Sequence, residues 1–194
     1  MTNTIVITGT PCTGKTRLAE LLNKKIKGSV LISANSVAKK GFVIGKDKHG
    51  SFIIDLKGLE KALNKIVSER KYGTVIIEGH LLCDIRIRNA KAIVLREHLE
   101  ALMHRQEKRK YAKEKILENI VAEATDYCGQ HAEKHYKDVY ELLSSSRSLY
   151  KNALRIANGA YRSKQNKQNK QNKQRIELLG ELLKIMKKER RFAI

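Results

Sequence analysis

The chain has 194 residues, of which 41% are hydrophobic, enough for one domain with its own core. No apolar run approaches the roughly 18 residues of a membrane-spanning helix, which excludes an integral membrane protein, and no membrane partner is expected. Forty Lys and Arg residues against twenty Asp and Glu give a net charge of +20, which favours a polyanionic partner such as RNA or else reflects a generally lysine-rich source.

The cysteines exclude two further classes of protein. Cys12, Cys83 and Cys128 are odd in number, lie far apart and form no C-x-x-C, so neither a disulfide framework nor a structural zinc site is expected. Reduced thiols, together with a beginning that lacks the pattern of a secretory signal, favour a cytoplasmic location.

The first elements surround a phosphate-binding motif. The β-branched run 4–9 predicts a buried strand, and the periodicity of 14–26 predicts a helix. Between them, "GTPCTGKT" fits G-x-x-x-x-G-K-[ST] in the strand–loop–helix context that the motif requires. The apolar face of the predicted helix comprises Leu18, Leu21, Leu22 and Ile26.

Each part of this loop has a physical role towards a phosphate chain. Gly9 and Gly14 permit backbone conformations that turn N–H groups inward, and the helix directs its positive end at the phosphates. Lys15 supplies a charge, and the Thr16 hydroxyl suits Mg²⁺. Cys12 is either a small packing residue or a thiol made reactive by the helix N-terminus. The predicted nucleotide-binding residues of the loop are Gly9, Pro11, Cys12, Thr13, Gly14, Lys15 and Thr16.

Residues 29–33 predict a second strand, and 34–58 form a mixed, glycine-containing segment. Within it, 41–55 predicts a small hairpin that turns at residues 48–50. Asp55 is placed to cap a helix over 56–70.

A carboxylate and an imidazole follow the third predicted strand, 74–80. Glu78 comes after four strand residues and suits the second shell of Mg²⁺, unless it is a buried acid paired with a lysine. His80, two residues later, either orients a water or a phosphate at the site or belongs to a surface loop.

The remaining elements complete an alternating pattern. We expect strands at 90–97 and 137–143 and helices at 97–111, 114–127 and 148–159. Alternating strands and helices indicate an α/β protein: a three-layer α/β/α P-loop fold on a five-stranded parallel sheet, with its site beyond the strands' carboxyl ends.

Two arginines stand on one face of the helix 97–111. Arg105 and Arg109 are four residues apart, and guanidinium groups suit phosphate oxygens and can stack on a base. From their charge alone they could equally form a solvated helix face.

The end of the chain has a different composition. The tripeptide run of 160–174 has almost nothing apolar to bury and predicts a flexible basic linker. Residues 175–194 predict an amphipathic helix, which packs back on the domain or docks on a partner. The excess charge is spread out, because 160–194 hold only 11 of the basic residues and 3 of the acidic ones.

Several stretches together resemble the nucleoside monophosphate kinases and, more narrowly, the adenylate kinase 6 family, whose members are adenylate-kinase-like ATPases linked to small-subunit ribosome maturation. The resemblance covers about residues 4–127 and extends weakly into "KDVYEL". The matching stretches are "ITGTPCTGKT", "VIIEGHLLCD", "IVLREH", "HRQEKRKY" and "KILENIVAEA".

The resemblance implies roles for individual residues. Lys15, Glu78, His80 and Arg109 would be catalytic, Arg105 would lie against the adenine, and Thr16 with Glu78 would hold Mg²⁺. Residues 1–159 would form the kinase core, with an acceptor-nucleotide insert at about 34–58 and a short lid at about 105–115. The segment after the lid matches at Glu118, Asn119 and Glu123.

The chain departs from the family at three places. Cys12 and Lys110 stand where the family usually has glycine. The acceptor region contains no arginine, so Lys39, Lys40, Lys46 or backbone groups must hold the acceptor phosphate. The lid is short and lacks cysteine, so no zinc is expected there.

The function implied is a Mg²⁺-dependent transfer of phosphate from ATP to AMP or another nucleoside monophosphate. The resemblance also implies an ATPase role in small-subunit maturation, with ribosomal protein uS11 and ribosomal RNA as partners. Two alternatives stay open: an ATP-hydrolysing assembly factor with little kinase activity, and a polynucleotide 5′-hydroxyl kinase. A regulatory GTPase is disfavoured because no N-K-x-D guanine motif is found.

Overall fold

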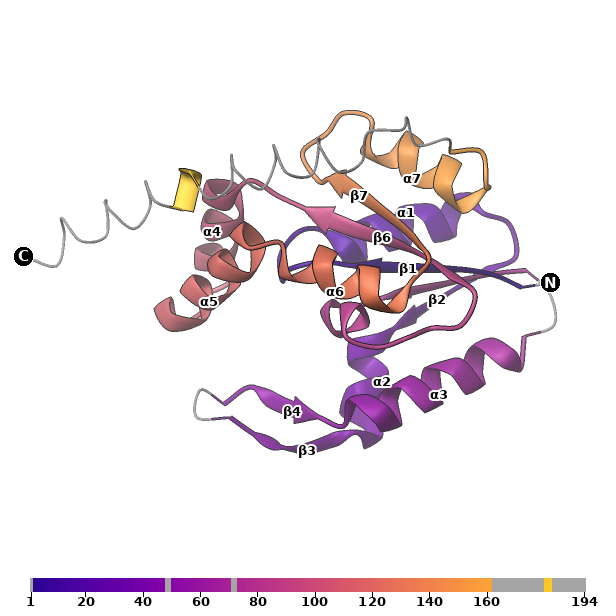
Figure 1. The fold of residues 1–194 in the computed structure, drawn as a ribbon, viewed down its shortest axis with the longest axis horizontal. Coiled ribbons are helices and arrows are strands. Elements are labelled where there is room, and N and C mark those ends of the chain that lie inside the picture. Colours follow the sequence, from indigo (N-terminus) through magenta and orange to yellow (C-terminus); the bar gives the residue numbers. More distant parts are fainter. Residues whose placement is uncertain (1, 48–49, 71–72, 162–179, 183–194) are drawn as a thin grey trace, which may run out of the picture.

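A parallel sheet forms the centre of the molecule (Figure 1). The computed structural model describes residues 2–47, 50–70, 73–161 and 180–182. The sheet has five strands in the order β2-β5-β1-β6-β7, all parallel, as the sequence predicts. Their bounds are Asn3–Thr8 for β1, Ser29–Ser33 for β2, Thr74–Glu78 for β5, Ala90–Arg96 for β6 and Asp138–Leu143 for β7.

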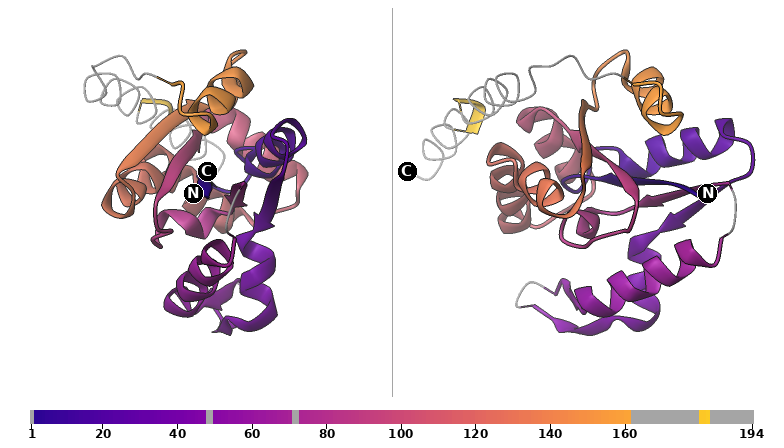
Figure 2. Two further views of the ribbon diagram at one scale, coloured as in Figure 1. Left: turned by 90° about the vertical axis from the view of Figure 1, so that its right-hand side faces the viewer. Right: turned by 45° about the vertical axis from the view of Figure 1, so that its right-hand side comes forward.

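Helices cover both faces of the sheet, which confirms the three-layer fold (Figure 2). α1 (Lys15–Lys25) and α7 (Leu149–Ala157) pack on one face. α2 (Ala34–Gly41), α3 (Leu56–Ser68) and α6 (Tyr127–His135) belong to the core of the other. Side chains alternate along β1 accordingly: Ile5 and Ile7 contact the first layer, and Val6 contacts the second.

One part of the predicted helix face on α1 is wrong. Leu18 and Leu22 are fully buried, whereas 42% of Leu21 is exposed. Ala19 takes a place in the core instead. The face of α1 that packs on the sheet is therefore formed by Leu18, Ala19 and Leu22, and lies part of a turn away from the predicted face.

The segment 34–58 contains the predicted hairpin, formed by β3 (Val43–Lys46) and β4 (Phe52–Ile54). Its turn residues Lys48 and His49 lie outside the described residues. The Asp55 carboxylate accepts a hydrogen bond of 3.1 Å from the Gly58 amide, so the predicted cap is confirmed. The helix α2 was not predicted, because it buries only two small side chains, Ala34 and Ala38.

The pair of helices after β6 differs from the prediction at its end. α4 (Leu99–Lys108) and α5 (Lys113–Ala124) match the two expected helices in place. The helix predicted to run to 127 ends at 124, because Asp126 takes a left-handed conformation with φ 58°. Its carboxylate pairs there with Arg96. The helix α6, which follows, was not predicted. A short 3₁₀ helix, η1 (His80–Cys83), was also not predicted from the sequence.

The predicted linker and C-terminal helix lie outside the described residues, except for 160–161 and 180–182, of which the latter are helical. Glu181 accepts hydrogen bonds near the start of α4, from the Leu99 amide and the His98 ring. None of the described helices is long and apolar enough to cross a membrane.

Candidate active site

The phosphate loop connects β1 to α1 across two glycines in the left-handed half of backbone space. Gly9 has φ 136°, and a Cβ there would overlap the carbonyl oxygen of Leu95 in β6. Gly14 has φ 99° and forms the N-cap of α1. The loop thus needs glycine at both positions, and the N-terminus of α1 offers its free amides and positive dipole end to an anion.

Lys15 is buried inside this loop. Its ammonium group donates hydrogen bonds to the carbonyl oxygens of Gly9 (2.9 Å) and Thr10 (2.8 Å). Burial lowers the pKa of Lys15 from its ordinary value, while the carboxylates of Glu78 and Glu123 act in the opposite direction. The two carbonyl oxygens hold the ammonium group of Lys15 at the base of the loop, where a phosphate chain would need a positive charge.

Glu78 lies at the carboxyl end of β5, beside β1. Its carboxylate accepts a hydrogen bond of 3.1 Å from the Thr16 hydroxyl. A hydroxyl and a carboxylate side by side fit a Mg²⁺ ion, which binds oxygen and keeps several waters or phosphate oxygens. Within the described ranges no three His, Cys, Asp or Glu side chains gather into a metal site, so Mg²⁺ here would depend on the nucleotide for further ligands.

His80 begins η1, directly after Gly79. The Thr8 hydroxyl donates a hydrogen bond to its carbonyl oxygen (3.3 Å), which ties η1 to the end of β1. Burial lowers the pKa of the His80 imidazole to about 4, and the charges of Lys15 and Lys115 act in the same direction. The imidazole is therefore neutral at neutral pH and stands within the field of Lys15.

The structure brings both predicted arginines to the phosphate loop, Arg105 from α4 and Arg109 from the position directly after the last residue of that helix. Arg105 donates a hydrogen bond of 3.3 Å to the Cys12 carbonyl oxygen and forms an ion pair of 2.6 Å with the fully buried carboxylate of Glu97. Arg109 lies 3.5 Å from the Cys12 sulfur. Spacing along one helix indicated that they share a face, but only the fold shows that this face meets residues more than ninety positions earlier.

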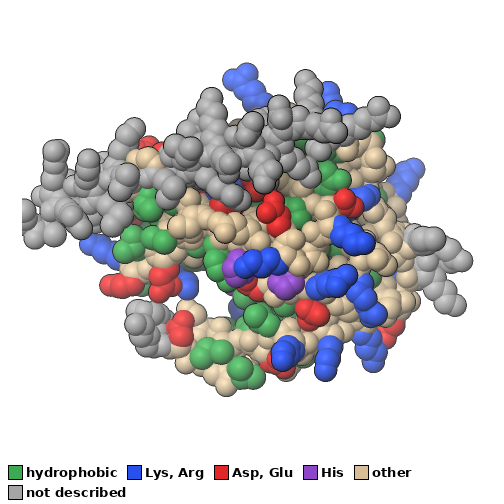
Figure 3. All heavy atoms as spheres, in the orientation of Figure 1, with side chains coloured by type: hydrophobic (Ala, Val, Ile, Leu, Met, Phe, Trp, Pro, Cys, Tyr) green, Lys and Arg blue, Asp and Glu red, His purple; other side chains and the backbone are tan. Residues whose placement is uncertain are grey.

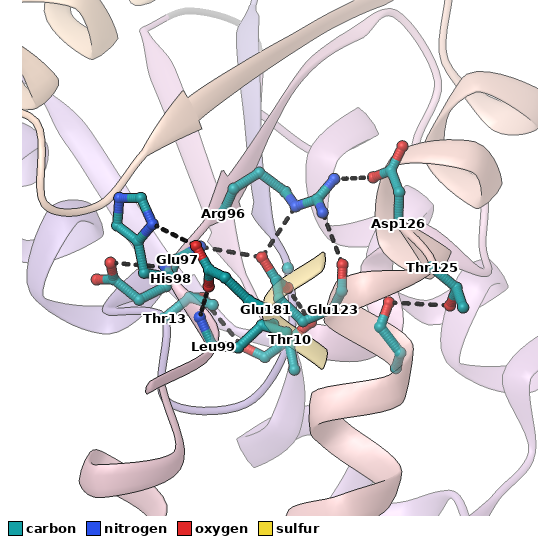
Figure 4. A network of polar contacts seen from close by, with 12 residues as sticks. Thr10, Thr13, Arg96, Glu97, His98, Leu99, Glu123, Thr125, Asp126 and Glu181 are labelled. Atoms are coloured by element: carbon teal, nitrogen blue, oxygen red, sulfur yellow. Dashed lines mark hydrogen bonds and ion pairs between the residues drawn. The ribbon is translucent and has the colours of Figure 1, made fainter. Parts of the chain in front are cut away.

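A buried polar network joins the loop to α5 (Figure 4). Glu123 accepts hydrogen bonds from the Thr10 hydroxyl, from Nε of Arg96 (2.9 Å) and from the Glu97 amide (2.9 Å). Arg96 also pairs with Asp126. Sequence reasoning matched Glu123 to a family segment but assigned it no role. The available signal was Arg96 followed by Glu97 at the end of an apolar strand, where buried charges require partners.

Pro11, the next residue of the phosphate loop, is also held by a hydrogen bond from a buried side chain. Gln106, fully buried on α4, donates to the Pro11 carbonyl oxygen (3.3 Å) and accepts a bond of 2.9 Å from Asn119 on α5. Thr10, Pro11 and Cys12 are thus each contacted by α4 or α5. The helices α4 and α5 and the phosphate loop are therefore joined by hydrogen bonds.

The two departures from the family glycines occupy the same kind of backbone. Cys12 has φ 72° and Lys110 has φ 57°, both in the left-handed region. Glycine adopts this region without steric strain, whereas in other residues the Cβ atom comes too close to the following carbonyl oxygen. The structure therefore accounts for the glycines of the family pattern, although it gives no reason for a cysteine in this chain.

Comparison with known proteins agrees with this geometry. The model of the AAA domain family matches residues 5–126. A curated protein of Methanothermobacter thermautotrophicus named "Putative adenylate kinase" is 38% identical over 148 residues, covering 74% of this chain and 81% of that protein. One of Methanocaldococcus jannaschii with the same name is 38% identical over 125 residues, covering 64% and 68%.

Solved structures support the fold alone. A shikimate kinase from Acinetobacter baumannii aligns with a TM-score of 0.55 at 13% identity, over 80% of this chain and 91% of that chain. A gluconokinase from Sinorhizobium meliloti aligns with a TM-score of 0.51 at 13% identity, over 82% and 95%. The resemblance seen in the sequence is confirmed: the chain belongs to the AAA domain family of P-loop proteins and, within it, to the family of the archaeal adenylate-kinase-like proteins.

Proposed function

We propose that the protein transfers the terminal phosphate of ATP to AMP or another nucleoside monophosphate, with Mg²⁺ bound. The observation that carries this proposal is the meeting of lid arginines with the phosphate loop. Arg105 and Arg109 contact Cys12, three residues before Lys15, whose ammonium group is buried in the same loop. Phosphoryl transfer depends on such positioning and charge neutralisation more than on covalent chemistry.

The roles follow from the contacts. Lys15 and the α1 N-terminus would bind the β and γ phosphates, Arg109 would neutralise charge on the transferred group, and Arg105 would face the adenine. Thr16 and Glu78 would hold Mg²⁺, which supplies charge neutralisation when bound. Neutral His80 can accept or donate one hydrogen bond without adding charge. Closure of the lid over the loop would exclude water and so limit hydrolysis.

The acceptor side is also cationic. The Nζ atoms of Lys39 on α2 and Lys46 on β3 lie 6.0 and 5.5 Å from the ring centroid of Phe52, which is 47% exposed. We infer that these lysines take the place of the arginines that the acceptor region lacks, with the phosphate of the monophosphate held between them. Lys46→Gln should then raise KM for AMP and leave KM for ATP unchanged, while Lys57→Gln on α3 should alter neither.

A second candidate is supported by the net charge of +20: an ATPase acting on a small-subunit ribosomal precursor, with RNA and the protein uS11 as partners. Glu78 and His80 would then place the attacking water. A cytoplasmic location is part of either proposal and is compatible with three free thiols.

One set of assays separates the candidates. ADP formation from ATP with AMP is compared with phosphate release without AMP, each with and without RNA, and with RNA bearing a 5′-hydroxyl as acceptor. Acceleration of ATP consumption by AMP supports the monophosphate kinase, and the same rate with and without AMP rejects it. Lys15→Ala should abolish every activity, whereas Lys24→Ala, at the exposed end of α1, should retain it.

A further inference from the structure

A basic groove lies away from the phosphate loop, between α3 and the loop that follows η1. Its volume is about 620 Å³, and its basic lining residues are Lys61, Lys65, Arg86 and Arg88. The single carboxylate of the lining belongs to Glu60. Figure 3 shows Lys and Arg side chains gathered over α3 and the loop beside it.

The loop that carries the two arginines is fixed in place. Ile85 and Ile87 are buried in the core, so the intervening Arg86 and the following Arg88 are exposed. The buried Asn64 amide donates to the Arg86 carbonyl oxygen (2.8 Å) and accepts from the Arg88 amide (2.9 Å). The pattern "IRIR" of residues 85–88 alternates in the same way.

The groove keeps most of its positive charge available. The Glu60 carboxylate accepts a bond of 2.9 Å from the Arg86 backbone amide, which directs it at the main chain. Lys65 lies 4.0 Å from Glu69 in an exposed pair, which binds weakly. Within the described part of the chain, Lys61 and the two arginines have no ion-pair partner.

The lining indicates what kind of anion fits. Every lining side chain is charged or polar, and none is aromatic, so the groove offers no surface on which a base could stack. Lys61 and Lys65 are one helical turn apart, about 6 Å along α3, and stand opposite two guanidinium groups. Such an arrangement suits successive phosphates along a strand, which are read without regard to sequence.

We propose that this groove binds the phosphate backbone of an RNA strand. The proposal rests on the second candidate function above for its RNA ligand and gives that ligand a binding surface. It is independent of the proposed phosphotransfer, because none of the groove residues belongs to the phosphate loop. RNA bound here would lie on α3, the helix that follows the acceptor-side insert, and would leave the nucleotide site accessible.

The test uses the full-length protein and a fluorescein-labelled 12-residue oligouridine, followed by anisotropy between 50 and 250 mM salt. Arg86→Gln with Arg88→Gln should raise Kd about tenfold and reduce the salt slope by about 1.4, since each single-strand phosphate contact contributes about 0.7. Lys61→Gln with Lys65→Gln, on the other wall, should act in the same direction.

The control removes the same charge elsewhere. Lys24→Gln with Lys25→Gln, exposed on the helix that covers the opposite face of the sheet, should change Kd less than twofold. Equal weakening by the control pair, or no weakening by the groove pair, would overturn the proposal. So would tighter, groove-dependent binding of polyglutamate of the same length, which would indicate an acidic protein partner. Thermal unfolding reports on the folding of each variant, and the ADP-forming assay reports separately on phosphotransfer.

Discussion

Thr10, in the phosphate loop, donates a buried hydrogen bond to Glu123, which lies 113 residues later on α5. The same carboxylate accepts from Arg96 and from the Glu97 amide, at the end of β6. One side chain therefore connects the loop, the sheet and α5. Because Glu123 and Arg96 are almost completely buried, neither charge can turn to solvent when the other is removed.

Glu123→Gln is expected to destabilise the protein by about 3 kcal/mol, because it leaves the guanidinium of Arg96 with a smaller compensating charge in the interior. Phosphotransfer should fall as well, since the loop loses its anchor on α5. Urea unfolding measures the first effect, and ADP formation at saturating ATP measures the second.

The matched control is Glu118→Gln on the same helix. Glu118 is half-exposed and pairs with Lys115 at 3.0 Å, a contact of about 0–1 kcal/mol. If both variants lose the same free energy of unfolding, the buried network contributes no more to stability than an exposed ion pair.

A second prediction compares two glycines with left-handed backbones, Gly9 and Gly28. Gly9→Ala places a methyl group against the Leu95 carbonyl oxygen, so overpacking of about 1–3 kcal/mol is added to backbone strain of about 1 kcal/mol. Gly28→Ala, at φ 70°, meets no atom within 4 Å and suffers the strain alone. Urea unfolding of the two variants should therefore differ by more than 1 kcal/mol, and equal losses would contradict the close approach of loop and strand.

Much of this site could be predicted from local sequence. The motif from Gly9 to Thr16, the acid at the end of β5 and the parallel sheet are encoded in patterns of a few residues, and the structure places Thr16 beside Glu78 as expected. That Arg105 and Arg109 lie near one another could also be predicted, because a spacing of four puts two side chains on one helix face, although Arg109 lies just past the last residue of α4.

What could not be predicted depends on long-range contacts or on weak patterns. No local pattern shows that Glu123 would meet Thr10, or that Gln106 would reach Pro11. The early end of α5 follows from the pairing of Asp126 with Arg96, which requires the fold to exist. α2 buries two alanines only, and a stripe so small is not distinguished from a loop by periodicity.

A third prediction addresses Cys12, whose φ of 72° is unfavourable for any residue with a side chain. Cys12→Gly removes strain of about 1 kcal/mol but adds a similar entropy to the unfolded chain, so stability should change by less than about 1 kcal/mol and activity should remain. Cys12→Val should destabilise clearly, because β-branched residues tolerate this region worst. Thermal unfolding of the glycine and valine variants measures both effects. A valine variant as stable as wild type would exclude a left-handed backbone at residue 12.

The last prediction is a dependence on pH that arises at His80. Its pKa is about 4 in the folded protein, below the ordinary value of 6.5, so between these two pH values the unfolded chain binds more protons than the folded one. The contribution of this group is fully present above pH 6.5 and is lost as the pH falls towards 4. His80→Gln should therefore reduce the acid sensitivity of the free energy of unfolding, measured in urea from pH 7 to pH 4. His104→Gln, exposed on α4, serves as the control and should keep the wild-type profile. If His80→Gln also keeps that profile, the imidazole is not desolvated beside Lys15, and its place within the site would have to be abandoned.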